Sequence, residues 1–122
     1  GHYSSPVLME CMQRDEDKLL DAVLVSINAN DHLYFNHQYN AIPLAAAKGM
    51  GVIAMKVFAD GAMFGREPGW SHLDPQVIRT VGSESVPSGP LVKYALSVPG
   101  VSTAMIGSGQ VDQTPEFGRR TA

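Results

Sequence analysis

Short apolar runs that alternate with stretches of helical pattern constrain the fold of this chain more than any other feature of its sequence. Residues 21–28 (DAVLVSIN) and 51–58 (GVIAMKVF) are short, rich in β-branched residues and almost entirely apolar. Such runs are typical of strands buried on both faces of a parallel sheet. A third run, residues 101–106 (VSTAMI), follows a Pro-Gly break. We therefore expect about three parallel strands joined by crossover connections.

Helices are predicted between and before these strands. A first-turn proline precedes apolar residues at helical spacing in residues 6–14. Residues 36–48 carry a second helical pattern and end at Gly49, a residue suited to the left-handed position after a helix. Pro43 is expected to kink or fray this second helix. A third helix is predicted over residues 88–97, directly before the third strand.

The remaining segments carry weaker patterns. Residues 59–87 hold many glycines and prolines and predict a long loop with one short helix at 74–79. Phe64 and Trp70 lie in this loop, where they form either a lid or substrate wall or only a small core of the loop itself. Residues 114–122 show no apolar periodicity and are predicted to form a disordered tail.

The alternation predicts the α/β class with flanking helices, and two architectures compete for it. One is a small doubly wound sheet, and the other is a partial (β/α)₈ TIM barrel. A complete barrel needs about 250 residues. The chain has 122 residues, so it supplies one domain of about half that size.

Charge and composition exclude several classes of function. The 9 Lys and Arg residues are outnumbered by 12 Asp and Glu, which leaves a net charge of −3. A broad surface that follows nucleic-acid phosphates is not expected, whereas one local anion site remains open. Cys11 is the single cysteine and is predicted to pack in the core. The four histidines lack metal-ligand spacing, so no metal site is expected.

Nothing in the sequence predicts contact with a membrane. The longest strongly apolar run, residues 49–59, is interrupted by Lys56. It is shorter than the roughly 20 residues that a membrane-spanning helix needs. The first residues lack the basic stretch and apolar block of a signal peptide, so the expected location is the cytoplasm.

Ligands of parallel α/β proteins bind at the carboxyl ends of the strands, where three segments of this chain are expected to meet. Gly107 and Ser108 leave the third strand in a glycine turn that either cradles a phosphate or serves only as a connection. Lys56 interrupts the second apolar run. Its ammonium either extends to solvent from the strand end or points into the site as a phosphate, carboxylate or Schiff-base partner.

The residues of these segments, and the order of the segments along the chain, resemble those of the aldo-keto reductases. Residues 47–58, with GMGVIAMK at their centre, are similar to the seventh-strand region of that family. Residues 86–107 resemble its last helix and eighth strand. Residues 21–28 stand where the sixth strand is expected, and Gly1-His2 is similar to the turn that leaves the fifth. The resemblance extends to about residue 113.

The resemblance implies an NADP(H)-dependent oxidoreductase that reduces a carbonyl group of a small molecule to an alcohol. Residues 1–122 would be the C-terminal half of such a barrel. The catalytic Asp, Tyr, Lys and His of the family come from earlier strands, so the resemblance implies no catalytic residue here and no activity of this chain alone. It does imply cofactor-binding positions at the strand ends: Asn28 near the carboxamide, Met55 at the nicotinamide-stacking position, Lys56 and Phe58 in the loop near the pyrophosphate, and Gly107, Ser108 and Gln110 at the adenosine-side phosphate turn.

Some positions depart from the pattern of the family. Leu24 or a neighbour stands where many members have a Gln, and Met55 replaces an aromatic residue. The Lys-Ser and Arg pattern for a 2′-phosphate is missing at Gly107-Ser108, so NAD(H) is not excluded as the cofactor.

Two further functions remain open. In the first, the chain is a non-catalytic half-barrel that self-associates through its open sheet edges as a binding or assembly module. In the second, it is a small doubly wound phosphate-binding protein that uses the Gly107 turn.

Overall fold

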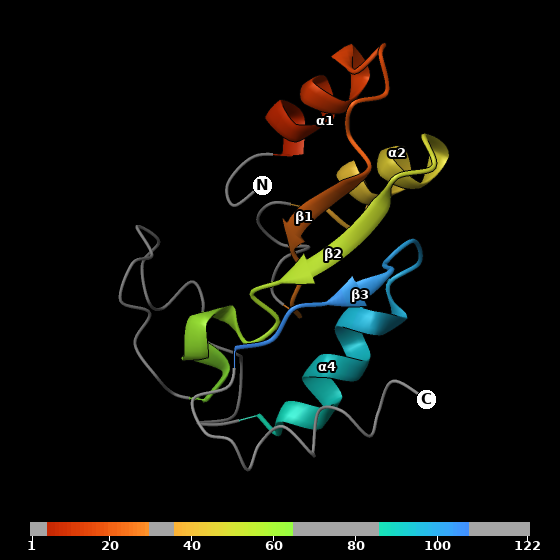
Figure 1. The fold of residues 1–122 in the computed structure, drawn as a ribbon. Coiled ribbons are helices and arrows are strands. Elements are labelled where there is room, and N and C mark those ends of the chain that lie inside the picture. The colour runs from red at the N-terminus through yellow and green to blue at the C-terminus, as the bar shows by residue number, and fades with distance from the viewer. Residues whose placement is uncertain (1–4, 30–35, 65–85, 108–122) are drawn as a thin grey trace.

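The computed structural model describes residues 5–29, 36–64 and 86–107 of the chain, which alternate between helices and short strands (Figure 1). Three predicted strands and three predicted helices are present, and all but α4 have altered bounds. The elements in chain order are α1 (Ser5–Arg14), β1 (Ala22–Ser26), α2 (Ala41–Ala47), β2 (Gly51–Met55), the 3₁₀ helix η2 (Ala59–Phe64), α4 (Ser88–Ser97) and β3 (Thr103–Ala104).

The strands form one open parallel sheet in the order β1-β2-β3. Val25 of β1 pairs with Ala54 of β2, and Ala54 pairs in turn with Ala104 of β3. Backbone hydrogen bonds continue the ladder past the strand ends, from Ile27 N to Met55 O at 3.0 Å and from Met105 N to Ala54 O at 2.8 Å. The chain is therefore α/β with parallel strands, as the alternation of patterns predicts.

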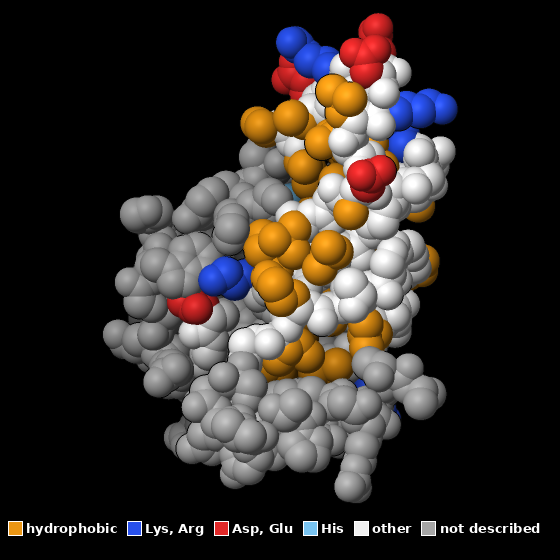
Figure 2. Space-filling view, in the orientation of Figure 1, with side chains coloured by type: hydrophobic (Ala, Val, Ile, Leu, Met, Phe, Trp, Pro, Cys, Tyr) orange, Lys and Arg blue, Asp and Glu red, His pale blue; other side chains and the backbone are white. Residues whose placement is uncertain are grey.

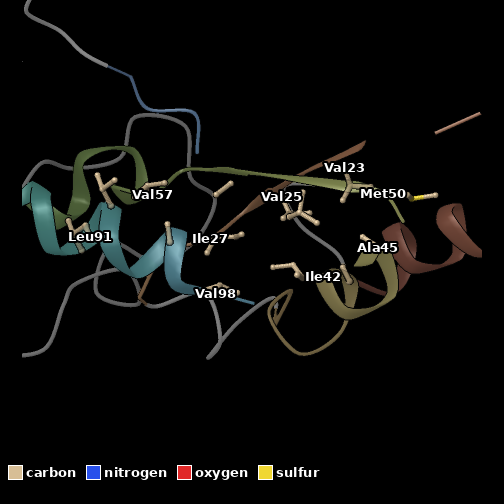
Figure 3. Close-up of a cluster of buried hydrophobic side chains, with 14 of the residues drawn as sticks. Val23, Val25, Ile27, Ile42, Ala45, Met50, Val57, Leu91 and Val98 are labelled. Atoms are coloured by element: carbon tan, nitrogen blue, oxygen red, sulfur yellow. The ribbon is translucent and has the colours of Figure 1, made fainter. Parts of the chain in front are cut away.

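The two faces of this sheet are covered by other parts of the chain to different extents. Successive residues of a strand point to opposite faces, so the paired side chains of Val25 and Ala54 share one face. Figure 3 shows α2 and α4 on the same side of the sheet, and their apolar side chains join this face in one core. The core cluster comprises Met12, Val23, Val25, Ile27, Ala41, Ile42, Ala45, Met50, Val52, Ala54, Val57, Met63, Leu91, Val92, Ala95 and Val98.

The opposite face is only partly covered, which corrects the expectation of strands buried on both faces. Leu24 pairs with Ile53 on this face, and 36% of Leu24 is exposed. Figure 2 shows hydrophobic side chains gathered over the sheet on the side turned to the viewer. The reason is topological: α2 and α4 pack on one face, and an apolar run in a strand does not specify how many layers will cover it.

Helix α1 packs against α2, and Lys48, the residue after α2, bonds to the carboxyl end of α1. The Lys48 ammonium donates hydrogen bonds to the backbone carbonyls of Met12 and Asp15, at and just beyond the end of α1. A cation is favourable at the carboxyl end of a helix.

Met12 turns toward the core, whereas Cys11 is exposed, so the prediction that Cys11 packs in the core is wrong. One helix face alone is buried, and adjacent residues lie about 100° apart around it.

Helix α2 is shorter than the helical pattern of residues 36–48. It begins at Ala41, and residues 37–40 form turns. Pro43 consequently lies in the first helical turn, where its missing N–H removes no helical hydrogen bond. Of the kink or fraying expected at Pro43, the structure shows a late start of the helix, since residues 36–40 are not helical. Gly49 has φ +73°, which confirms the left-handed position predicted after the helix.

Strand β2 also ends earlier than predicted. The chain turns at Lys56, and η2 occupies the start of the segment predicted as a long loop. Helix α4 coincides with the predicted helix 88–97, and β3 is confined to Thr103–Ala104. The predicted helix at 74–79, Trp70 and the tail 114–122 lie outside the described residues. In the part of the chain that the structure describes, no helix combines the length and hydropathy needed to cross a membrane.

Candidate functional site

The carboxyl ends of the strands lie at one edge of the sheet, where the arrowheads of Figure 1 point the same way. Two residues predicted from the sequence meet there. Asn28 follows β1 and is buried, and its Nδ2 donates a hydrogen bond to the backbone carbonyl of Lys56 at 3.2 Å. The structure thus joins residues 28 positions apart in the sequence at the edge where ligands of parallel sheets bind.

Lys56 leaves β2 in an unusual backbone conformation. Its φ is +54°, in the left-handed region that costs a residue with a Cβ about 1 kcal/mol or more. Its Nζ lies 3.7 Å from Oδ1 of Asp60, and the two side chains are 27% and 31% exposed. The ammonium is thus neither buried nor fully solvated, and it has a carboxylate neighbour that any anionic ligand must compete with.

The turn after Lys56 is tight. Ala59 and Asp60 have φ of +49° and +59°, and Gly61 follows with φ +90°. The Ala59 N–H donates to the Lys56 carbonyl at 2.8 Å, and the Gly61 N–H donates to the Phe58 carbonyl at 2.9 Å. These bonds close consecutive turns after Lys56, and η2 begins at Ala59. A long open loop does not begin here, contrary to the expectation for residue 59 onward.

Met55 and Phe58 have different surroundings. Met55 pairs with Ser26 on the sheet face opposite the core, and both residues are buried. Phe58 is partly buried against the core. Its ring centroid lies 4.9 Å from that of Phe64, with the planes tilted by 50°. Phe64 therefore packs on an aromatic residue from the predicted strand 51–58, outside the predicted loop.

Gly107 is the one described residue of the predicted phosphate turn. It is exposed, and a Cβ built on it would meet nothing within 4 Å. Steric crowding therefore does not require glycine at this position. Ser108 and Gln110 lie outside the described residues. The described part of the predicted site thus consists of Asn28, Met55, Lys56 and Phe58 together with this glycine.

Sequence reasoning missed two residues beside the site: Gln38, which contacts Asn28, and Tyr94, which contacts Gln38. Gln38 lies in the turn before α2, and its Nε2 lies 3.5 Å from the backbone carbonyl oxygen of Asn28. The hydroxyl of Tyr94, on α4, lies 2.9 Å from the same Nε2. No sequence signal connects positions 38 and 94, because their proximity depends on how α4 and the turn pack at the end of β1.

A second missed pair lies inside the molecule. Ser5 Oγ lies 3.0 Å from Nδ1 of His37, and both residues are buried. Burial lowers the pKa of His37 to about 4, so the ring is neutral at pH 7. Among residues 5–29, 36–64 and 86–107, no group of three or more His, Cys, Asp and Glu side chains is placed to hold a metal ion.

The chain was compared with protein-family models, curated proteins and solved structures. No protein-family model, curated protein or solved structure matches the chain.

Proposed function

We propose that the chain is the cofactor-side part of an NADP(H)-dependent oxidoreductase of the aldo-keto reductase type, which reduces a carbonyl compound to an alcohol. The observation that carries this proposal is the meeting of Asn28, Met55 and Lys56 at the carboxyl edge of the sheet. These are three of the positions at which the sequence resemblance implies cofactor contacts. Their grouping supports the proposal because Asn28 and Lys56 are 28 positions apart in the sequence.

The sheet topology favours a barrel segment over a doubly wound sheet. The strands follow one another in sequence order, and α2 and α4 lie on the same face. A (β/α)₈ barrel has its helices outside and strand neighbours in chain order, whereas a doubly wound sheet carries helices on both faces. In a barrel the partly covered face with Leu24 and Ile53 would turn toward the interior.

The side-chain chemistry of the described site residues suits a dinucleotide ligand. The Lys56 ammonium suits a phosphate oxygen, and Met55 lies buried beside it at the end of β2. NADPH, when bound, supplies the hydride. Lys56 would hold and orient the anionic part of the cofactor, while the buried Met55 would line the site from beneath. The general acid that the reduction needs is not assigned to this chain, so the chain alone is expected to turn over no substrate.

A titration of the ¹⁵N-labelled chain with NADPH tests this proposal. Amide resonances of Met55, Lys56, Phe58 and Gly107 should shift together, and Lys56→Met should weaken binding. Arg14→Met is the matched control, since Arg14 is an exposed cation on α1 paired with Glu10. Shifts elsewhere, or none at these four residues, would refute the cofactor site. NADPH consumption by the chain with a panel of aldehydes would refute the absence of catalytic residues.

A second function, self-association as an assembly module, is favoured by the exposed side chains on the sheet. Leu24 and Met105 are 36% and 56% exposed, and in the described residues the outer edges of β1 and β3 pair with no strand. Light scattering should then detect a dimer that Leu24→Glu dissociates. Leu19→Glu, at an exposed leucine in the loop before β1, should leave the dimer intact. A monomer at millimolar concentration would contradict this function.

A further inference from the structure

A continuous chain of polar contacts runs from α4 to the carboxyl end of β2. The Tyr94 hydroxyl accepts a hydrogen bond from Gln38 Nε2 at 2.9 Å, and the backbone carbonyl of Asn28 lies 3.5 Å from the same nitrogen. Asn28 Nδ2 donates in turn to the Lys56 carbonyl at 3.2 Å. We call these three residues, Tyr94, Gln38 and Asn28, the relay. With Lys56 it connects four separate segments, and it ends on the backbone of that lysine.

The relay ends where the backbone needs support. Lys56 has φ +54°, and its carbonyl accepts hydrogen bonds both from Asn28 Nδ2 and from the Ala59 N–H. A residue with a Cβ adopts this conformation only when surrounding contacts outweigh its cost. The two bonds to the Lys56 carbonyl are such contacts, and one of them depends on the relay.

The left-handed turn determines where the Lys56 side chain lies. If β2 continued in extended form, residue 56 would share the face of Val52 and Ala54, because side chains alternate along a strand. That face is packed against α2 and α4, where an ammonium without full solvation is costly. The turn instead leaves the Lys56 side chain partly exposed near Asp60 at the edge of the sheet.

We propose that Gln38 and Tyr94 are positioning residues that act through Asn28 to hold the Lys56 ammonium where it binds the phosphate groups of a dinucleotide. This inference rests on the proposed function. It also assigns Asn28 a role that the resemblance does not imply, since its amide nitrogen supports the backbone of Lys56. Gln38 and Tyr94 themselves touch no ligand.

A double-mutant cycle tests the relay. Tyr94→Phe removes only the hydroxyl and Gln38→Met only the amide. Each should lower NADPH affinity about threefold to tenfold, the range of coupling expected for residues in one hydrogen-bond network. In a Lys56→Met background the same substitutions should change the affinity less than about twofold, because no ammonium is left to misplace. Tyr39→Phe, at an exposed tyrosine beside Gln38, should have no effect in either background.

Each outcome bears on the relay. Equal losses in both backgrounds would show a general structural role and overturn it, as would no loss in either. If the unchanged chain binds no NADPH, the proposed function fails, and the relay is then decided without ligand. Tyr94→Phe and Gln38→Met must shift the Lys56 and Val57 amide resonances and alter the Lys56 HN–Hα coupling that reports φ. Unchanged resonances would overturn the relay, and thermal unfolding monitored in parallel identifies a variant that has not folded.

Discussion

Ser5 Oγ lies 3.0 Å from Nδ1 of His37, and the bond joins the first residue of α1 to the turn that precedes α2. Both residues are buried, so the hydroxyl and the ring replace water as partners for each other. The pair and the ammonium of Lys48 hold opposite ends of α1 to the segment containing α2. The attachment of α1 therefore depends on a few polar contacts as well as on apolar packing.

Acid should weaken the fold through His37. Its pKa falls from 6.5 in the unfolded chain to about 4 in the fold because burial disfavours the charged ring. Between these values the unfolded chain binds more protons, so stability is complete above pH 6.5 and declines as the pH falls toward 4. The total loss is on the order of 3 kcal/mol. Urea unfolding at pH 7.5 and pH 5 should show a smaller difference for His37→Gln than for the unchanged chain; equal differences would contradict the assignment.

Removing the partner hydroxyl should destabilise the chain at all pH values. Ser5→Ala leaves a buried imidazole nitrogen without its 3.0 Å contact, at a cost of about 1 to 2 kcal/mol in the free energy of unfolding. Ser97→Ala is the matched control, because Ser97 is exposed and bonds only within its own helix turn. It should change stability by less than about 0.5 kcal/mol. Similar effects of the two substitutions in urea unfolding would refute a special role of Ser5.

Two glycines with left-handed backbones should differ in their tolerance of alanine. Gly100 has φ +94°, and a Cβ there would lie 3.0 Å from Cγ2 of Ile42. Gly49 has φ +73°, with nothing within 4 Å of a built Cβ. Gly49→Ala should cost about 1 kcal/mol for the backbone alone, and Gly100→Ala about 2 kcal/mol or more because the Ile42 side chain must also shift. A smaller loss for Gly100→Ala, measured by urea unfolding, would contradict this packing.

Asp60 should restrain anion binding at Lys56. Its carboxylate lies 3.7 Å from the ammonium and competes with any phosphate for it. Asp60→Asn should therefore raise NADPH affinity about twofold to fivefold, with a steeper dependence on salt concentration. Calorimetric titration at low and high ionic strength measures both effects. Glu10→Gln, which removes the partner of exposed Arg14, should leave the affinity unchanged, and an equal gain there would indicate only a change in net charge.

Much of the fold follows from local pattern. The strands β1 and β2 lie inside the predicted runs 21–28 and 51–58, α4 matches its prediction, and Gly49 has the predicted left-handed backbone. Apolar β-branched runs and a glycine after a helix carry these signals in a few adjacent residues. The bounds are less well predicted, because the end of β2 at Met55 depends on the turn that Lys56 makes with partners far away in the sequence.

The sequence by itself determined the α/β class, the parallel strands and the positions of Asn28, Met55 and Lys56 at strand ends. Only the tertiary structure decided that one sheet face is partly covered, that Cys11 is exposed, and which residues contact the site. Gln38 and Tyr94 are 56 positions apart, and Ser5 and His37 are 32. Hydrophobic periodicity indicates which side of a helix or strand is apolar. Which polar residues form hydrogen bonds across the fold depends instead on how the helices and strands pack. A single sequence does not record that packing.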